Sequence, residues 1–209
     1  MKEQKIVIID YGMGNTGSVK NAVYTLGYDV SISNKKKDIE RATHIILPGV
    51  GAFGDGVGNL KKLGLIDILK EEVLVKKKPL LGICLGFQML ADRGEEGGAH
   101  AGLGWVGGSV RRFNVREKEF RLPHVGWNDI VLSDDSELFA GVKRPIFYFV
   151  HSYHFVPQGD GVNILAVAEY GEKFVAALRA DNIWGVQFHP EKSQQEGLVV
   201  LDNFLQITS

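Results

Sequence analysis

The first half of the chain alternates short apolar runs with segments in which apolar residues recur at helical spacing. An unbroken apolar run bounded by turn residues is typical of a strand buried on both faces of a parallel sheet. Apolar residues at helical spacing predict an amphipathic helix packed on such a sheet. The predicted strands are Lys5–Ile9, 28–32, His44–Leu47 and 79–83. The predicted helices are 19–26, ended by Gly27, then 60–75, interrupted at Gly64, and 84–91.

The second half is richer in β-branched and aromatic runs than in helical periodicity. Its predicted strands are 110–113, 145–151, 163–170, 173–179 and, after a tight turn at 180–182, 183–188. Together the two halves predict an α/β fold: a doubly wound, mostly parallel sheet with antiparallel strands added in the second half. We find no linker, internal repeat or low-complexity segment. The whole chain, 1–209, is therefore expected to form a single domain.

The charge balance, the cysteine count and the N-terminal segment disfavour several classes of function. The 24 basic and 25 acidic residues give a net charge of −1, which disfavours nucleic acid and anionic membranes as main partners. The lysine runs 35–37 and 76–78 are interpreted as solvated loops. One cysteine excludes an internal disulfide, and the scattered histidines lack metal-ligand spacing, so we expect neither a metal nor a cofactor. The short apolar stretch at the N-terminus does not suit a signal peptide, which predicts a cytoplasmic protein.

Cys84 is the candidate nucleophile. It lies in Gly-Ile-Cys-Leu-Gly, residues 82–86, between a predicted strand and a predicted helix. A nucleophile on such a tight turn stands clear of the sheet, and small neighbours leave the backbone room for a strained geometry. The start of the helix favours a thiolate, and the N–H of Leu85 would point toward a developing oxyanion. The alternative is a buried structural cysteine, the commoner fate of a lone thiol.

A second segment offers the partners that a catalytic cysteine needs. His189 follows the predicted strand 183–188, so it lies at a strand end, where open α/β sheets place their sites. Glu191 comes two residues later, past Pro190, whose ring stiffens the turn. A carboxylate at this position can hold the imidazole in one tautomer and orientation, as in a catalytic triad. The alternative is an ordinary His-Pro-Glu turn on the surface.

Together, segments 82–86 and 188–191 resemble the triad segments of class I glutamine amidotransferases. Further segments resemble one branch of that family, the glutaminase subunits of imidazole glycerol phosphate synthases, enzymes of histidine biosynthesis. The likeness extends from Ile6 to Phe204. The segments that carry it are DYGMGN (10–15), LPGVGAFG (47–54), PHVGWN (123–128), YFVHSY (148–153) and QFHPEKS (187–193).

The resemblance implies a reaction and a set of residues. Glutamine and water would give glutamate and ammonia, with Cys84 attacking the carboxamide, His189 moving protons and Glu191 orienting His189. Gly49, Val50 and Gly51 would join Leu85 in the oxyanion hole, after a rearrangement induced by the partner. Glutamine would contact Gln88, which lies on the same helical face as Cys84, and also Glu96, Ser152 and Tyr153. The partner would contact Asn15, Trp127, Asn128, Tyr148 and Lys192.

The implied partner is a cyclase subunit with a (β/α)8 barrel, which would form a heterodimer with this chain and use the ammonia. The sequence departs from the family pattern at two places: the residues after Asn15 are small, and position 154 is a histidine. These departures leave a related glutaminase subunit as an alternative. That subunit supplies ammonia for sugar amidation in surface-polysaccharide synthesis. Two alternatives come from other functional classes: a catalytically inactive scaffold or binding domain of this fold, and a Cys-His hydrolase or peptidase. The intact triad disfavours the first, and the pair Gln88 and Glu96, suited to a small zwitterion, disfavours the second.

Overall fold

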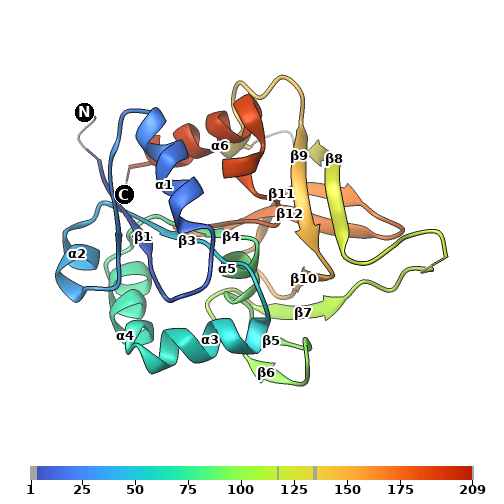
Figure 1. Cartoon of the computed structure of the whole chain (residues 1–209), viewed down its shortest axis with the longest axis horizontal. Helices are drawn as coiled ribbons and strands as arrows, with labels where there is room; N and C mark the ends of the chain where they lie inside the picture. Colours follow the sequence, from blue (N-terminus) through green and yellow to red (C-terminus); the bar gives the residue numbers. More distant parts are fainter. Residues whose placement is uncertain (1–3, 117, 134–135, 209) are drawn as a thin grey trace.

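The computed structural model describes residues 4–116, 118–133 and 136–208. Within those residues, nine strands form one sheet in the order β2-β1-β3-β4-β13-β12-β11-β8-β9 (Figure 1). Its parallel half holds β1 (Lys5–Ile9), β2 (Asp29–Ser33), β3 (His44–Leu47), β4 (Leu80–Ile83) and β13 (Ile183–Val186). Its antiparallel half holds β12 (Lys173–Ala180), β11 (Asn163–Glu169), β8 (His124–Leu132) and β9 (Ile146–His151).

Helices cover both faces of the parallel half, because its strands are apolar on both sides. In β1, Ile6 and Ile8 face one core, whereas Val7 and Ile9 face the other. Helices α1 (Thr16–Thr25) and α6 (Gln194–Gln206) pack over the first core. Helices α2 (Lys36–Arg41), α3 (Phe53–Lys62), α4 (Leu65–Lys70) and α5 (Leu85–Gln88) pack over the second (Figure 1). The predicted doubly wound α/β fold, with antiparallel strands added in the second half, is confirmed.

A smaller sheet, which the sequence pattern did not predict, lies beside the large one. Its order is β10-β7-β5-β6. The strands are β5 (Arg93–Gly94), β6 (His100–Ala101), β7 (Gly108–Arg112) and β10 (Tyr153–Pro157). Three short helical turns complete the described elements: η1 (Glu71–Val75), η2 (Glu137–Phe139) and η3 (Pro190–Lys192). No helix in the described part of the chain combines the length and apolar character needed to span a bilayer.

The predicted strands are found within two residues of their expected bounds, but the helix predictions need correction. The helix expected at 60–75 begins earlier, at Phe53, and Gly64, with φ +65°, separates α3 from α4. The helix expected at 84–91 is only α5, because the carbonyl of Met89 accepts the N–H of Leu103 at 2.8 Å instead of continuing the helical ladder. The lysine run 35–37, interpreted as a loop, enters α2.

The second lysine run, 76–78, is not simply solvated. The carboxylate of Glu72 is fully buried, and the ammonium groups of Lys76 and Lys78 each lie 2.6 Å from it. Burial alone would raise the pKa of Glu72, but hydrogen bonds and charge from the two lysines outweigh it and lower the pKa. This ion-pair cluster therefore ties η1 to the segment that leads into β4.

We expect Glu72→Gln to lower the free energy of unfolding by about 3 kcal/mol, since it leaves the largely buried Lys78 without its counter-charge. Because the folded pKa of Glu72 is lowered, its stabilisation is present above the unfolded pKa and disappears as pH falls through the folded pKa. Urea unfolding of both proteins at neutral and acidic pH measures this. Glu40→Gln, which breaks the exposed pair with Lys36, is the control and should change little. Equal effects of the two substitutions would contradict the argument.

Candidate active site

The predicted nucleophile, Cys84, sits on a strained turn between β4 and α5. Its backbone has φ +52° and ψ −107°, a conformation that L-residues rarely adopt. Its N–H donates to the carbonyl of Val186 on the neighbouring β13 at 2.8 Å, which holds the turn against the sheet. Glycine is required on either side. A Cβ on Gly82 would lie 2.8 Å from Cα of Phe87, and one on Gly86 would overlap the carbonyl oxygen of Leu47.

The other two predicted triad residues lie together just after the end of β13. Nδ1 of His189 is 2.9 Å from Oε1 of Glu191, and both side chains are almost fully buried. The backbone N–H of His189 donates to the carbonyl of Tyr148 at 2.9 Å, and its carbonyl accepts the hydroxyl of Ser193 at 2.7 Å. With Nδ1 committed to Glu191, Nε2 is the ring nitrogen that remains for Cys84.

The electrostatics of this pair suit nucleophilic chemistry. Burial by itself would lower the pKa of His189, but charge and hydrogen bonding from Cys84 and Glu191 raise it to about 10. The imidazole therefore keeps a proton at neutral pH. An imidazolium beside a sulfur is the charge arrangement found around activated cysteine nucleophiles.

Cys84 opens into a cavity of about 520 Å³ that is lined by all four predicted substrate residues. The loop before α3, the turn at Cys84, the chain before β6 and the junction of β9 with β10 each supply a wall. Its lining residues are Val50, Gly51, Ala52, Cys84, Leu85, Gln88, Glu96, Pro123, Val150, His151, Ser152, Tyr153 and Lys192. Predictions made from distant segments of the sequence thus meet in one cavity.

Gln88 shapes a wall of this cavity through contacts that its position in the sequence does not indicate. Its amide nitrogen donates to the carbonyl of Tyr153 at 2.8 Å and to Oε1 of Gln187 at 3.0 Å. The amide of Gln187 in turn donates to Sγ of Cys84 at 3.7 Å. Gln187 is fully buried and was not predicted as a site residue. The only signal for it was its place beside His189 in the motif at 187–193.

We expect Gln187→Leu to lower kcat/KM for glutamine hydrolysis about tenfold, because it removes the acceptor of Gln88 and the donor to the sulfur of Cys84. Steady-state glutamate release measures this. Gln206→Leu, at an exposed position whose amide contacts Asp202, is the control for a generic Gln-to-Leu effect. Unchanged kcat/KM in the Gln187 variant would show that the amide only fills space.

The carboxylate of Glu96 is held on the cavity wall by the start of helix α3. Oε2 of Glu96 accepts the N–H of Phe53, the first residue of α3, at 2.8 Å, where the helix dipole favours a negative charge. Glu96 lines the cavity, whereas Glu95 is exposed. The carboxylate on the cavity wall is therefore that of Glu96, as the resemblance implied.

The predicted oxyanion loop, 49–51, closes over Leu85 in this structure. The carbonyl of Gly49 accepts the N–H of Leu85 at 3.4 Å, so that amide already has a partner. The hydroxyl of Tyr11, which was not predicted as a site residue, donates to the carbonyl of Pro48 at 2.8 Å and holds the start of the loop. Burial raises the pKa of Tyr11, which keeps it a neutral donor. The N–H of Leu85 becomes available to an oxyanion only if the carbonyl of Gly49 turns away.

Three of the five residues predicted to face a partner, Trp127, Tyr148 and Lys192, lie together, and Lys192 also lines the cavity. Trp127 is 49% exposed, so it is a surface residue. The rings of Trp127 and Tyr148 meet edge to face at 6.1 Å, and Nζ of Lys192 lies 5.6 Å from the Tyr148 ring. The amide of Asn128 is turned inward, onto the carbonyl of Glu169 at 2.9 Å. Asn15 immediately precedes α1, a helix that packs beside η3, the turn containing Lys192.

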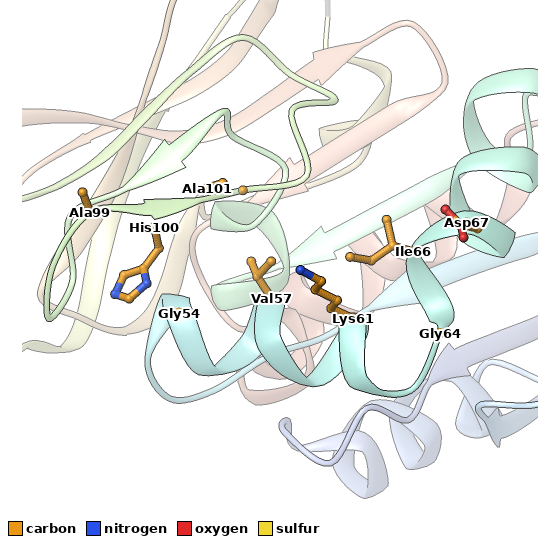
Figure 2. Close-up of a pocket in the computed structure, with 10 residues that line it drawn as sticks. Gly54, Val57, Lys61, Gly64, Ile66, Asp67, Ala99, His100 and Ala101 are labelled. Carbon is orange, nitrogen blue, oxygen red and sulfur yellow. The ribbon is translucent and has the colours of Figure 1, made fainter.

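A larger hollow, of about 650 Å³, lies between α3, α4 and β6 and contains none of the predicted site residues. Figure 2 shows Val57 and Lys61 between His100 at one end of the hollow and Ile66 at the other, with Ala101 above them. Its size alone does not make it the site, because it lacks the nucleophile and the buried acid–base pair found at Cys84.

Comparison with known proteins agrees with this geometry. Residues 7–207 match the family described as glutamine amidotransferase class-I. The imidazole glycerol phosphate synthase subunit HisH 2 of Methanococcus maripaludis is 47% identical over 96% of this chain and 98% of its own length. The subunit of the same name from Pseudomonas aeruginosa is 46% identical, over 97% and 99%. The subunit HisH of Aquifex aeolicus is 44% identical, over 96% and 95%.

Solved structures show the same fold at lower identity. A crystal structure of a glutamine amidotransferase superposes with a TM-score of 0.75 at 23% identity, covering 96% of this chain and 97% of its own. PurLQS from Thermotoga maritima superposes with a TM-score of 0.75 at 19% identity, covering 98% of both chains. From the match over nearly the whole sequence, the chain belongs to the class I glutamine amidotransferases and, among them, to the HisH subunits of imidazole glycerol phosphate synthase.

Proposed function

We propose that this chain is the glutaminase subunit of imidazole glycerol phosphate synthase. It hydrolyses glutamine to glutamate and ammonia and passes the ammonia to a cyclase subunit in histidine biosynthesis. The observation that carries the proposal is the cavity at Cys84, where the strained nucleophile lies with the wall residues Gln88 and Glu96, together with the buried His189–Glu191 pair, whose charge is coupled to Cys84. Relatives named as HisH subunits match it over 95–99% of their own length at 44–47% identity.

The geometry supports a covalent mechanism. The sulfur of Cys84 attacks the carboxamide carbon, and the carbonyl oxygen becomes an oxyanion. His189 gives its proton to the leaving nitrogen, so ammonia departs and a thioester remains. Water then attacks the thioester with His189 as the base, releasing glutamate and restoring the thiol. Glu191 keeps the imidazole of His189 oriented throughout.

The oxyanion hole is proposed to form in two steps. In the resting arrangement, the carbonyl of Gly49 occupies the N–H of Leu85. Turning the Gly49–Val50 peptide would free that N–H and present a second one from the loop, and the glycines at 49 and 51 make such a turn inexpensive. A partner that drives this change would couple glutamine hydrolysis to the presence of an acceptor.

The proposed partner is a cyclase with a (β/α)8 barrel. The patch formed by Trp127, Tyr148 and Lys192 is suited to it, since a half-exposed aromatic pair with a neighbouring cation is typical of an interface anchor. A cytoplasmic location follows from the proposed pathway. The substrate is the small zwitterion glutamine, with Glu96 facing its ammonium group.

The test is glutamate release from glutamine, with and without the cyclase subunit of the same organism and its nucleotide substrate. We expect slow release by the isolated chain and strong stimulation by the loaded cyclase. Release that the loaded cyclase does not stimulate would refute the histidine-pathway assignment and favour a sugar acceptor. Absence of release under both conditions would refute the glutaminase itself.

A further inference from the structure

Two buried histidines meet beside the cavity, and the proposed mechanism uses neither. His124 in β8 and His151 in β9 are directly opposite each other in the antiparallel register. Nδ1 of His124 lies 3.1 Å from Nε2 of His151. The rings of Tyr170 and Phe149 both stack on His124, with centroids at 4.1 and 5.1 Å, so the imidazole has little freedom to turn. His151 itself lines the cavity.

The hydrogen bonds of this pair can point in only one direction. Nδ1 of His151 is 2.9 Å from the carbonyl oxygen of Tyr153, which can only accept, so Nδ1 must carry a hydrogen. In a neutral ring Nε2 is then an acceptor, and Nδ1 of His124 must donate to it. The remaining Nε2 of His124 accepts from the amide of Asn128 at 3.4 Å, whose other hydrogen goes to the carbonyl of Glu169.

Both imidazole rings are neutral at neutral pH, as these hydrogen-bond directions require. Burial lowers the pKa of His124 to about 4 and that of His151 to about 3. At neutral pH each ring therefore has one donor and one acceptor, and the chain of bonds from Asn128 through His124 and His151 to the Tyr153 carbonyl is complete. We refer to these three side chains and that carbonyl as the histidine relay.

The relay ends on a carbonyl that is held from two sides. The oxygen of Tyr153 also accepts the amide of Gln88 at 2.8 Å. The preceding carbonyl, of Ser152, accepts the N–H of Phe113 at 3.1 Å. Both peptide groups at the junction of β9 and β10 are thus fixed from inside the protein. The segment 152–153 that lines the cavity is therefore held in one orientation.

We infer that His151 and His124 are positioning residues for glutamine. The relay fixes the 152–153 edge of the cavity and so sets the affinity for the substrate without touching the reacting atoms. The relay begins at Asn128, next to Trp127 on the proposed partner face. A continuous series of hydrogen bonds therefore connects that face with the glutamine cavity. This inference rests on the proposed glutaminase function and deepens it.

Paired variants of His151, made in the full chain, test the inference. Their glutamate release is measured in the presence of the cyclase subunit and its nucleotide substrate. His151→Leu removes the donor to the Tyr153 carbonyl, and we expect KM for glutamine to rise about fivefold with kcat within twofold. His151→Asn places an amide N–H at the Nδ1 position, and we expect it to restore most of the affinity. His124→Leu should raise KM less, because it frees His151 without removing it.

His154→Leu is the matched control. Its imidazole is equally buried and stacks on Phe113, which also contacts the His151 ring, but it is not part of the relay. An equal rise of KM in the His154 variant, or a His151→Asn no better than His151→Leu, would overturn the inference. If His151→Leu fails to fold, His151→Gln replaces it, because glutamine is polar yet lacks a donor at the Nδ1 position; equal KM for the Asn and Gln variants would again overturn it.

A second readout does not depend on activity. Nitrogen-15 NMR of histidine-labelled wild-type protein reports which ring nitrogen carries the hydrogen, and we expect His124 and His151 both to be Nδ1-protonated and neutral at pH 7. An Nε2-protonated His151 would overturn the relay even if the enzyme is active. If the wild type releases no glutamate while both tautomers are as expected, the proposed function fails and the relay geometry stands.

Discussion

We expect Cys84→Ala to lower glutamate release by about 10⁴-fold or more, because no other thiol is present to form the thioester. The fold should be unaffected. The side chain of Cys84 opens into the cavity, and the strained turn is held by the backbone bond to Val186 and by the glycines at 82 and 86. Glutamate release with the loaded cyclase, together with thermal unfolding of both proteins, measures the two halves of this expectation.

The single cysteine also allows a direct chemical test. Iodoacetamide should label the wild type once and inactivate it in proportion, and saturating glutamine should slow the labelling by occupying the cavity. Cys84→Ser keeps a hydroxyl in place of the thiol and serves as the conservative comparison, expected to remain strongly impaired. If either substitution left more than a trace of glutaminase activity, Cys84 would not be the nucleophile.

The parts of the fold that could be predicted from the sequence are those whose signal is local. In β1, four consecutive apolar residues pack against helices on both faces, so an unbroken apolar run identified the strand. In β8, Gly126, Asn128 and Asp129 interrupt the apolar pattern, and the strand forms through its ladder with β9 instead. Such a ladder depends on a partner distant in the sequence, which a pattern along the chain does not reveal.

The candidate site residues also fall into two groups: those with a local sequence signal and those brought together only by strand order. Cys84, Leu85 and Gln88 could be predicted because a strand, a tight turn and a short helix place them within five residues. Gln187 reaches Cys84 only because β13 lies next to β4, a neighbour relation fixed by the order of the sheet. The meeting of His124 with His151 likewise depends on the register of β8 and β9. The sequence therefore predicts the proposed reacting groups but not the residues that contact them from neighbouring strands.

Glu191→Gln should lower kcat by about 10³- to 10⁴-fold while leaving KM for glutamine nearly unchanged. Oε1 of Glu191 accepts from Nδ1 of His189 at 2.9 Å and so leaves Nε2 for the sulfur of Cys84. A glutamine amide carries no charge and can turn its NH2 toward Nδ1, which would disfavour the imidazolium that stabilises the sulfur of Cys84 as a thiolate and protonates the leaving nitrogen. The loss should therefore appear in the chemical step and not in substrate binding.

The pH profile distinguishes this explanation from a loss of packing. Glu191 helps to raise the pKa of His189, so its neutral replacement should move the basic limb of kcat/KM to lower pH. Glu172→Gln is the matched control: its carboxylate also lies near a buried imidazole, 3.5 Å from Nε2 of His154, but away from Cys84. We expect that variant to keep kcat within twofold and the limb in place. If the two variants lost activity equally, or the limb stayed fixed in Glu191→Gln, the carboxylate of Glu191 would be structural and the triad would reduce to Cys84 and His189.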